Sequence, residues 1–402
     1  MKEPRHWQTM RRLVHRDAGA VNLNAGTMSP TPKPVLKEVT RLRRLQAAGP
    51  SDFLWRQGPV LLETSRQRLA EYLSCRGDEL LLLSNVTWGL NVVANSLDLP
   101  VGSEILTTDH EYGAMDLLWR RLSERRGWRV RRVVLPYRSE RPDEIVRAFE
   151  AAFTRRTRVL FFSHVTSTTG LVLPAGRLCR LARRRGAVSI LDGAHAPGMV
   201  PVDLRKTGAD FYAANCHKWM MAPATVGFLH ARRSLRDTLQ PPITSWGWGY
   251  QPRRAHVRTP WGGTHWQQSH EFHGCEDRTP QMVLGATLDF RNRLGGDLAV
   301  AGRCRALAAH ARRRLAELGL TPATPVNPEL SGALVAGEFP SPQQAPPDHW
   351  LWNNHRIECP ITRSGGRAFL RISAAWFVTT GEIDKLARAM RHWMKQSKGA
   401  GR

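Results

Sequence analysis

Short apolar runs alternate with amphipathic stretches along most of the chain. The runs ELLLLS, EILTTD, TRVLFFSHV, AVSIL and ADFYAA contain almost no turn-forming residues. Each is short enough for a strand that is buried on both faces, as in a parallel sheet covered by helices. Between the runs, apolar residues recur at helical spacing. This alternation of strands and helices predicts an α/β fold.

The alternation begins after an amino-terminal arm. Residues 1–30 form that arm, which ends at the turn-rich segment NAGTMSPTPKP. Val35, Leu36 and Val39 then recur at helical spacing, and two prolines precede them, so we expect a first helix there. Further helices are predicted over 60–73, 87–97, 113–126, 143–152 and 175–185, with the apolar strands between them.

The pattern changes near residue 283. The segment 240–280 is rich in Pro, Gly and Trp, which is typical of loops. It is followed by one long predicted helix over 283–318, a strand SGALVAGEF, a Pro-rich loop, a strand LRISAA and a helix over 380–395. We therefore expect a large domain over 31–282 and a smaller one over 283–402.

Composition adds few constraints. The chain has 402 residues, of which 42% are hydrophobic and 23% charged, and this length favours two domains. No apolar run approaches the ~20 residues that span a bilayer, and the amino terminus lacks the apolar core of a secretory signal. The six cysteines form no CxxC pair and the histidines no HExxH motif. We expect a cytoplasmic protein with reduced thiols and no metal site.

The formal charge of +25 is unusual and comes from 59 Lys and Arg residues. Many occur in short clusters, such as Arg155–Arg156, Arg183–Arg185 and Arg312–Arg314. Neighbouring residues of a helix point in different directions, so these clusters do not make one basic face. Because there is no basic tail or nucleic-acid-binding motif, we predict no specific nucleic-acid partner. Diffuse attraction of acidic substrates or polyanions is the expected consequence.

Two reactive residues follow neighbouring apolar runs. Asp192 ends the run after Gly186, and Lys218 follows ADFYAA. Ligands of open α/β sheets bind outside the carboxyl ends of the strands, so both side chains should reach one crevice. A lysine and a carboxylate together suit pyridoxal phosphate, because the amine forms a Schiff base and the carboxylate keeps the pyridine nitrogen protonated. Spacing alone leaves open a sheet with a surface lysine.

The residues themselves resemble one family. DGAHAPG, GADFY and NCHKW, in this order, resemble the class V aminotransferases, a branch of the fold-type I pyridoxal phosphate enzymes. The nearest resemblance is to the isopenicillin N epimerase-like group, whose relatives include cysteine desulfurases and C–S lyases. SNVTWGLN, TTDHEYGA, SHVTSTTGLVLP, APATVGFLH and LRISAAWFVTTGEIDKLA extend the likeness over roughly residues 20–390. The resemblance implies a mostly parallel seven-stranded sheet domain, a smaller α/β domain and a homodimer.

The resemblance also implies roles for residues around the cofactor ring. Lys218 forms the Schiff base and Asp192 pairs with the ring nitrogen, where an ionised carboxylate strengthens the electron sink. His195 matches the family position beside the ring hydroxyl, although a histidine there can also simply pack. His110, in TDHEY, matches the residue that stacks on the ring and moves protons at the substrate α-carbon. A purely structural histidine at a strand end is the alternative for His110.

A second group matches the family's phosphate site. Thr87 lies where SNVTWGL passes from a strand into a helix, and helix-start N–H groups bind anions. The Val86 backbone N–H is expected to contribute there. A simple N-cap threonine would use the same geometry without a ligand. Asn215 and His217 resemble the family's SxHK pattern, with an amide in place of the serine hydroxyl.

Further positions concern the substrate and the partner subunit. Arg371, in LRIS, matches the carboxylate-binding arginine, whose planar fork grips a carboxylate through two parallel bonds. In an arginine-rich chain, a structural arginine is the alternative. Thr166 or its neighbour Ser167 is expected to bond the ring oxygen or the substrate. Gly274 and Cys275 correspond to a Gly-Thr pair that reaches the phosphate of the neighbouring subunit, so here the hydroxyl is missing.

The sequence leaves the reaction open. Epimerisation, transamination and C–S cleavage would all use the same lysine, aspartate and arginine, and the predicted substrate pocket (24–27, 245–250 and 261–273) does not separate them. Cys359 is the nearest candidate for a desulfurase nucleophile, but Pro360 follows it and stiffens the chain, so we predict a packing role. A non-catalytic basic protein on this fold is a further alternative, and retention of lysine, aspartate and arginine together argues against it.

Overall fold

The computed structural model describes residues 3–249, 262–347 and 349–399. Its centre is a seven-stranded sheet in the order β2-β8-β7-β6-β5-β3-β4. β8 runs antiparallel to both of its neighbours, and the other pairs are parallel. The predicted mostly parallel sheet is therefore confirmed. The strands are β2 (Leu80–Leu83), β3 (Glu104–Thr108), β4 (Arg129–Val133), β5 (Thr157–Ser163), β6 (Val188–Asp192), β7 (Phe211–Asn215) and β8 (Gly227–Ala231).

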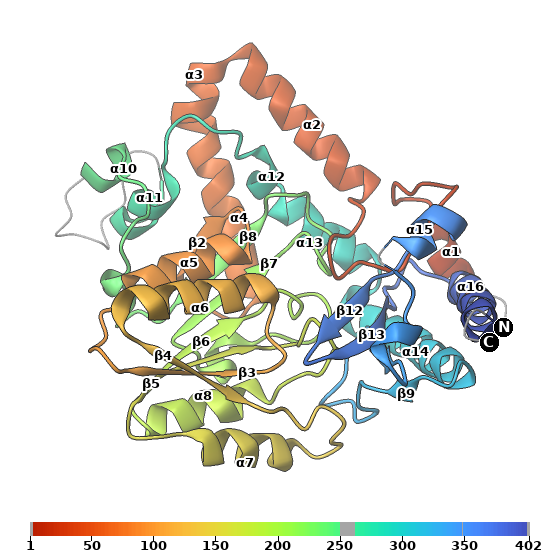
Figure 1. The fold of residues 1–402 in the computed structure, drawn as a ribbon. Helices are drawn as coiled ribbons and strands as arrows, with labels where there is room; N and C mark the ends of the chain where they lie inside the picture. The colour runs from red at the N-terminus through yellow and green to blue at the C-terminus, as the bar shows by residue number, and fades with distance from the viewer. Residues whose placement is uncertain (1–2, 250–261, 348, 400–402) are drawn as a thin grey trace.

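Helices cover both faces of this sheet (Figure 1). α5 (Val86–Ser96) and α6 (Gly113–Arg126) lie on one face, and α7 (Pro142–Ala152) and α8 (Ala175–Arg184) on the other. Successive strand residues point to opposite faces, so Phe161 packs with Trp119 under α6 while Phe162 packs with Phe149 of α7. Burial on both faces explains why the strands are nearly all apolar.

A smaller sheet in the order β12-β13-β10-β9 forms the second layer of structure beside the large domain. α14 (Gly296–Glu317) contacts β10 of this sheet and α16 (Thr380–Gly399), and the amino-terminal arm joins them because β1 (Val21–Asn22) pairs with β11 (Ile357–Glu358). The arm's α1 (Arg5–Arg11) forms an ion pair with the start of α16. The remaining strands are β9 (Thr321–Pro322), β10 (Leu334–Glu338), β12 (Ile361–Ser364) and β13 (Arg367–Ser373).

A helical hairpin projects from the large domain at the top of Figure 1. It consists of α2 (Lys33–Ala48), α3 (Pro50–Asp52), the π-helical η1 (Phe53–Gln57) and α4 (Gly58–Tyr72). Within the described ranges, no helix is both long and apolar enough to cross a membrane. The shorter elements are η2 (Gly77–Glu79), α9 (Leu204–Thr207), η3 (Arg236–Thr238), α10 (Trp246–Gly249), α11 (His265–Glu271), α12 (Thr279–Met282), α13 (Leu284–Arg293), η4 (Pro342–Gln344) and α15 (Trp350–His355).

Two predictions about helices were wrong. The single helix expected over 283–318 is two helices, α13 and α14. Gly295 lies between them with φ of +96°, and Gly296 is the first residue of α14 with φ of +75°. These angles are open to glycine and end a right-handed helix. The segment 240–280 is not all loop, since α11 lies within it. Thr264 and Gln267 form a capping box at its start, a signal that the many Gly and Pro residues obscured.

Candidate active site

A cavity of about 440 Å³ opens at the carboxyl ends of β5, β6 and β7, against the small sheet. This is where ligands bind in open α/β sheets, and its size suits a small molecule. Much of the predicted cofactor and substrate site lies together here. The predicted residues that line it are Val86, Thr87, Asp192, His195, Asn215, His217, Lys218 and Arg371.

Asp192 forms part of the cavity wall at the end of β6. Its side chain is buried, and Oδ1 accepts a 2.8 Å hydrogen bond from the Ala194 N–H. Burial raises the pKa of Asp192, while this N–H and the Lys218 charge oppose the rise. The side chain also lines the cavity. A ligand N–H⁺ on the cavity side would favour its ionised form, which is what a protonated pyridine nitrogen offers.

Lys218 follows β7, and its Nζ lies 3.3 Å from Nε2 of His195. Burial lowers the pKa of Lys218 to about 8; Asp192 opposes this effect and Arg371 adds to it. The amine is therefore uncharged in a useful fraction of molecules near neutral pH, as a nucleophile or base requires.

The neighbouring histidine is held as a neutral ring. Burial, with the charges of Lys218 and Arg371, lowers the pKa of His195 well below its ordinary value. Nδ1 of His195 accepts a 3.4 Å hydrogen bond from Trp219 Nε1. Since Nδ1 accepts, the single proton of the ring belongs on Nε2, which then donates to the uncharged Lys218 amine. His195 thus orients the lysine in this structure.

The start of α5 presents N–H groups to the cavity. Asn85 caps the helix through its Oδ1, and Asn215 Oδ1 accepts the Val86 N–H at 2.9 Å. The prediction that the Val86 N–H serves a phosphate is thereby corrected, because a side chain of the chain itself already uses this donor. Thr87 lines the cavity at this helix start, and among the described residues the buried His217 Nδ1 has no partner. The helix start and this unsatisfied nitrogen fit a phosphate.

Arg371 reaches the cavity from β13 of the small sheet. Nη1 donates to the Ser167 carbonyl and hydroxyl at 2.7 and 3.0 Å, and Nη2 donates to Asn24 Oδ1 at 2.9 Å. Every one of these acceptors is uncharged. The arginine is 4% exposed, and burial lowers its pKa to about 10. Its Nε has no partner in the part of the chain that the structure describes. A Cβ on Gly26 would lie 3.1 Å from Nη2, so this glycine keeps the space clear.

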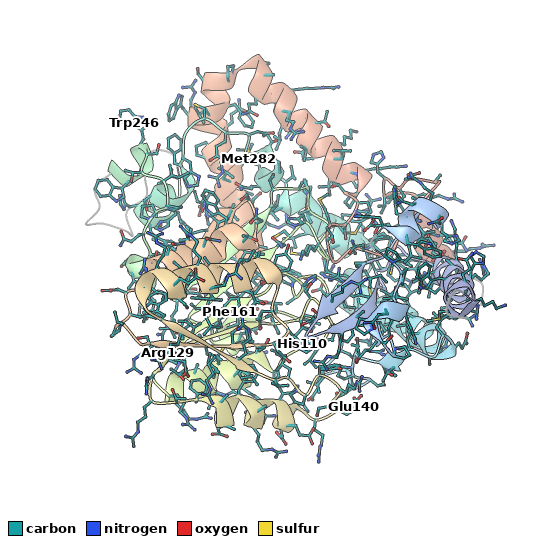
Figure 2. All side chains as sticks on the ribbon, viewed as in Figure 1. His110, Arg129, Glu140, Phe161, Trp246 and Met282 are labelled. Carbon is teal, nitrogen blue, oxygen red and sulfur yellow. The ribbon has the colours of Figure 1, made fainter. Side chains whose placement is uncertain are left out.

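His110 does not line the cavity as predicted. Its Nδ1 lies 2.8 Å from the Asp109 carboxylate, and its ring packs 4.9 Å from that of Tyr137. Figure 2 shows it where the large sheet meets the small domain. The side chain that lines the cavity from the same loop is Tyr112. The predicted stacking role of His110 therefore finds no support in its position, because neighbouring side chains already cover the ring.

Thr166 is also displaced from its predicted role. Its hydroxyl lies 2.9 Å from that of Thr169 and accepts the Leu171 N–H at 3.0 Å. Both contacts stabilise a tight loop, so Thr166 is structural here. Its neighbour Ser167, the other candidate, lines the cavity and contacts Arg371.

Gly274 and Cys275 lie away from the cavity. Gly274 lines a separate cleft with Phe53 and Gly58 beside the projecting hairpin, and Cys275 is exposed. Their predicted reach into a neighbouring subunit stays a prediction. Of the predicted substrate pocket, Gly26 and Thr27 line the cavity, whereas Tyr250 and Trp261 lie outside the described residues.

Several lining residues were missed from the sequence, among them Asn85, Tyr112, Ser163 and Thr362. Ser163 ends β5 and pairs in register with Asp192, so the rule that located Asp192 also applies to it. Tyr112 follows β3 at the same edge. Thr362 belongs to the small sheet, and no local signal in the sequence places it against the large domain.

The comparisons with known proteins agree with this geometry. A family model of aminotransferase class V matches residues 20–335. The chain is 43% identical over 397 residues to an isopenicillin N epimerase of Amycolatopsis lactamdurans, covering 97% of this chain and 99% of that protein. It is 41% identical over 390 residues to an isopenicillin N epimerase of Streptomyces clavuligerus, with coverages of 96% and 97%.

Solved structures show the same fold. The apo cysteine desulfurase of Thermococcus onnurineus has a TM-score of 0.78 at 19% identity, covering 98% of this chain and 100% of that one. A complex of the cystine C–S lyase C-DES with its product cysteine persulfide has a TM-score of 0.78 at 23% identity, with coverages of 93% and 97%. At these identities the likeness concerns the fold.

Proposed function

The chain belongs to the class V aminotransferase family and is a pyridoxal phosphate-dependent enzyme, and on this premise we propose that it epimerises an amino acid at the α-carbon. The substrate we propose is isopenicillin N or a close relative. The observation that carries the proposal is Arg371, a buried cation with only neutral partners, in one cavity with Lys218. Such an arginine binds a carboxylate, and the lysine is then placed near the adjacent carbon.

Each residue of the cavity has a separate role in this reaction. Pyridoxal phosphate, when bound, supplies an electron sink that labilises a bond at the substrate α-carbon. Lys218 holds the cofactor and moves the proton at that carbon, and Asp192 keeps the pyridine nitrogen protonated. Thr87 and His217 both line the cavity and bind the phosphate, and His217 Nδ1 has no other partner among the described residues. Arg371 fixes the carboxylate, so that the α-carbon is held in a constant position.

The environment of Cys359 argues against a desulfurase. Its Sγ donates to the Arg371 carbonyl at 3.3 Å, the residue is 8% exposed, and burial raises the pKa of its thiol. A desulfurase needs an accessible thiolate. Epimerisation needs no thiol, and the relatives at 43% and 41% identity are named as epimerases.

We further propose that the protein is a homodimer. Apolar side chains are exposed on the projecting hairpin and on α10, notably Leu36, Val60 and Trp246 at 39%, 65% and 74% exposure. Trp246 points outward from the surface in Figure 2. An exposed apolar patch of this kind is typical of an interface, and Gly274 lies beside it. Light scattering should give twice the monomer mass, and a monomer at micromolar concentration would contradict the proposal.

We also propose a cytoplasmic location and no specific nucleic-acid partner. The arginine clusters lie on α8, on α14 and before β5, so they do not form one face. We expect weak DNA retention that disappears at moderate salt. Sequence-selective binding at physiological salt would contradict this expectation.

The deciding experiment follows the α-hydrogen. The holoenzyme is incubated with isopenicillin N in deuterium oxide, and the products are analysed by chiral chromatography and mass spectrometry. We expect the opposite epimer with deuterium at the α-carbon, without keto acid or sulfide. Formation of a keto acid or of sulfide as the main product would overturn the proposed reaction. Lys218→Ala should lose the visible absorbance of the bound cofactor and all turnover, and a borohydride-reducible adduct at another lysine would contradict its role.

A further inference from the structure

Epimerisation requires a proton to leave one face of the α-carbon and another to arrive on the opposite face. A single base rarely reaches both faces of a rigidly held carbon, so a second proton carrier is needed in the cavity. The ionisable side chains that line it are Tyr112, Asp192, His195, His217, Lys218 and Arg371. They come from different walls.

Most of these groups already form hydrogen bonds on the lysine's side of the cavity or have another role. His195 is hydrogen-bonded to Lys218 Nζ, and His217 precedes the lysine in the chain. His195 therefore lies on the lysine's side of the cavity, and His217 is assigned to the phosphate. Asp192 ends the central strand, and Arg371 approaches from the small sheet with its fork directed to Ser167 and Asn24. Tyr112 is the remaining group that can exchange a proton.

The sheet order places Tyr112 opposite Lys218. Lys218 follows β7 and Tyr112 follows β3, and β6 and β5 lie between these strands. Three strand spacings separate β7 from β3, or about 14 Å. Both side chains line the one cavity above β6 and β5, so they enter it from its two flanks.

The loop that carries Tyr112 is firmly anchored. The preceding residue, Glu111, turns inward and accepts 2.6 Å hydrogen bonds from the Thr108 and Ser163 hydroxyls. Ser163 pairs in register with Asp192, so this anchor fixes the loop relative to the catalytic floor. Tyr112 itself is the N-cap residue before α6, and its hydroxyl has no hydrogen-bond partner among the described residues. It is 50% exposed and near enough to Arg371 for their charges to interact.

We propose that Tyr112 is the second acid–base group of the epimerisation, acting on the face of the α-carbon opposite Lys218. This inference rests on the proposed function. In one direction the Lys218 amine takes the α-proton and the Tyr112 hydroxyl gives its own proton to the other face. In the reverse direction the phenolate takes the proton and the lysine ammonium gives one. No bond other than C–H and N–H or O–H changes, and exchange with water restores both starting protonation states.

The test is Tyr112→Phe, which removes only the hydroxyl. Each epimer of isopenicillin N is incubated separately with the holoenzyme in deuterium oxide. For the epimer whose α-proton faces Lys218, we expect the variant to exchange this proton for deuterium with retention of configuration, within a few-fold of wild type. Formation of the opposite epimer should fall by at least about a hundredfold. The absorbance of the bound cofactor should match that of wild type.

Tyr72→Phe is the matched control, since Tyr72 ends α4 outside the cavity and should leave both rates unchanged. Epimerisation by Tyr112→Phe within threefold of wild type would overturn the inference, as would equal loss of exchange and epimerisation with the cofactor absorbance intact. If Tyr112→Phe does not fold, Tyr112→His carries the test, and it should epimerise with a pH profile shifted to lower pH. An unshifted profile would overturn the inference. A wild type that forms no opposite epimer refutes the proposed function instead.

Discussion

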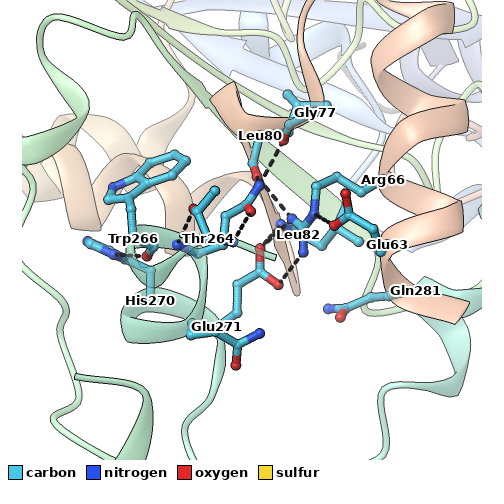
Figure 3. A network of polar contacts seen from close by, with 12 residues as sticks. Glu63, Arg66, Gly77, Leu80, Leu82, Thr264, Trp266, His270, Glu271 and Gln281 are labelled. Carbon is cyan, nitrogen blue, oxygen red and sulfur yellow. Dashed lines mark hydrogen bonds and ion pairs between the residues drawn. The ribbon is translucent and has the colours of Figure 1, made fainter. Parts of the chain in front are cut away.

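Two buried arginines of this chain have opposite surroundings. Arg66, on α4, is 2% exposed and forms two hydrogen bonds of 2.6 and 3.1 Å with Glu271, which also accepts from Arg278 at 3.0 Å (Figure 3). Arg371 is 4% exposed, and its partners are an amide oxygen, a carbonyl and a hydroxyl. The two are equally buried, and only the first has a counter-charge.

The pKa values show the consequence. Burial disfavours the charged form of both arginines, yet the carboxylates of Glu271 and Glu63 raise the pKa of Arg66, whereas the pKa of Arg371 falls to about 10. A buried cation without an internal counter-charge is unfavourable for folding. Such a group remains useful where a ligand brings the missing anion. The comparison therefore separates an arginine that stabilises the fold from one that binds a substrate.

The largest effect is expected at Glu271. Glu271→Gln keeps the shape of the side chain but removes the carboxylate that Arg66 and Arg278 share, and Arg66 keeps its ion pair with Glu63. Breaking a buried pair in this way costs about 3–5 kcal/mol. Urea unfolding should show this loss in the free energy of unfolding. Asp289→Asn is the control, because its ion pair with Arg68 is exposed and is worth about 0.5 kcal/mol. Equal losses in the two variants would refute the distinction.

Lys218 extends the comparison to a second unpaired cation. Its pKa is about 8 in the folded protein and 10.5 when exposed, so between these pH values the unfolded chain binds more protons. Stability from this group therefore rises with pH across the window, and below pH 8 the folded state is penalised by about 3 kcal/mol. The Lys218→Met variant should have a higher free energy of unfolding than wild type at pH 7, both without cofactor. This difference should vanish by pH 10.5. A constant difference would contradict the assignment.

At Arg371 the effect should appear in binding and not in folding. Arg371→Met removes an uncompensated charge, so the free energy of unfolding should stay the same or increase. Arg371→Lys replaces a two-pronged contact by a point charge and should raise KM by roughly tenfold to a hundredfold with a smaller change in kcat. Steady-state kinetics and urea unfolding measure the two effects. Destabilisation by Arg371→Met comparable to that of Glu271→Gln would show that Arg371 is structural.

The sequence predicted the parts of the site that local pattern determines. Asp192 and Lys218 end apolar strands, and position at a strand end is sufficient to bring them into one crevice. Most helices and strands of the large domain also begin and end within a few residues of their predicted bounds. These elements depend on periodicity within a single stretch of chain.

The sequence did not predict which hydrogen-bond or ion-pair partner each polar group has in the folded chain. The Val86 N–H was expected to face a ligand, but a distant Asn215 accepts it. His110 was expected on the cofactor, but the adjacent Asp109 and Tyr137 hold its ring. Arg66 pairs with Glu271, which is 205 residues away in the chain. No local sequence pattern marks this arginine, so only the folded structure shows that it has a buried counter-charge and that Arg371 has none.

The smallest effect is expected at Cys359, which lies beside Arg371 and is the nearest thiol that could supply a negative charge. Burial raises the pKa of this thiol, and its Sγ–H donates to the Arg371 carbonyl, so it is neutral and compensates nothing. Cys359→Ala should lower the free energy of unfolding by about 1 kcal/mol and should leave KM within about twofold of wild type, since the charge on Arg371 does not depend on the sulfur. Kinetics with isopenicillin N and an assay of sulfur release from free cysteine check this together. If wild type released sulfur from cysteine and Cys359→Ala lost this activity with its cofactor absorbance intact, the thiol would be a nucleophile, and the cavity would belong to a desulfurase.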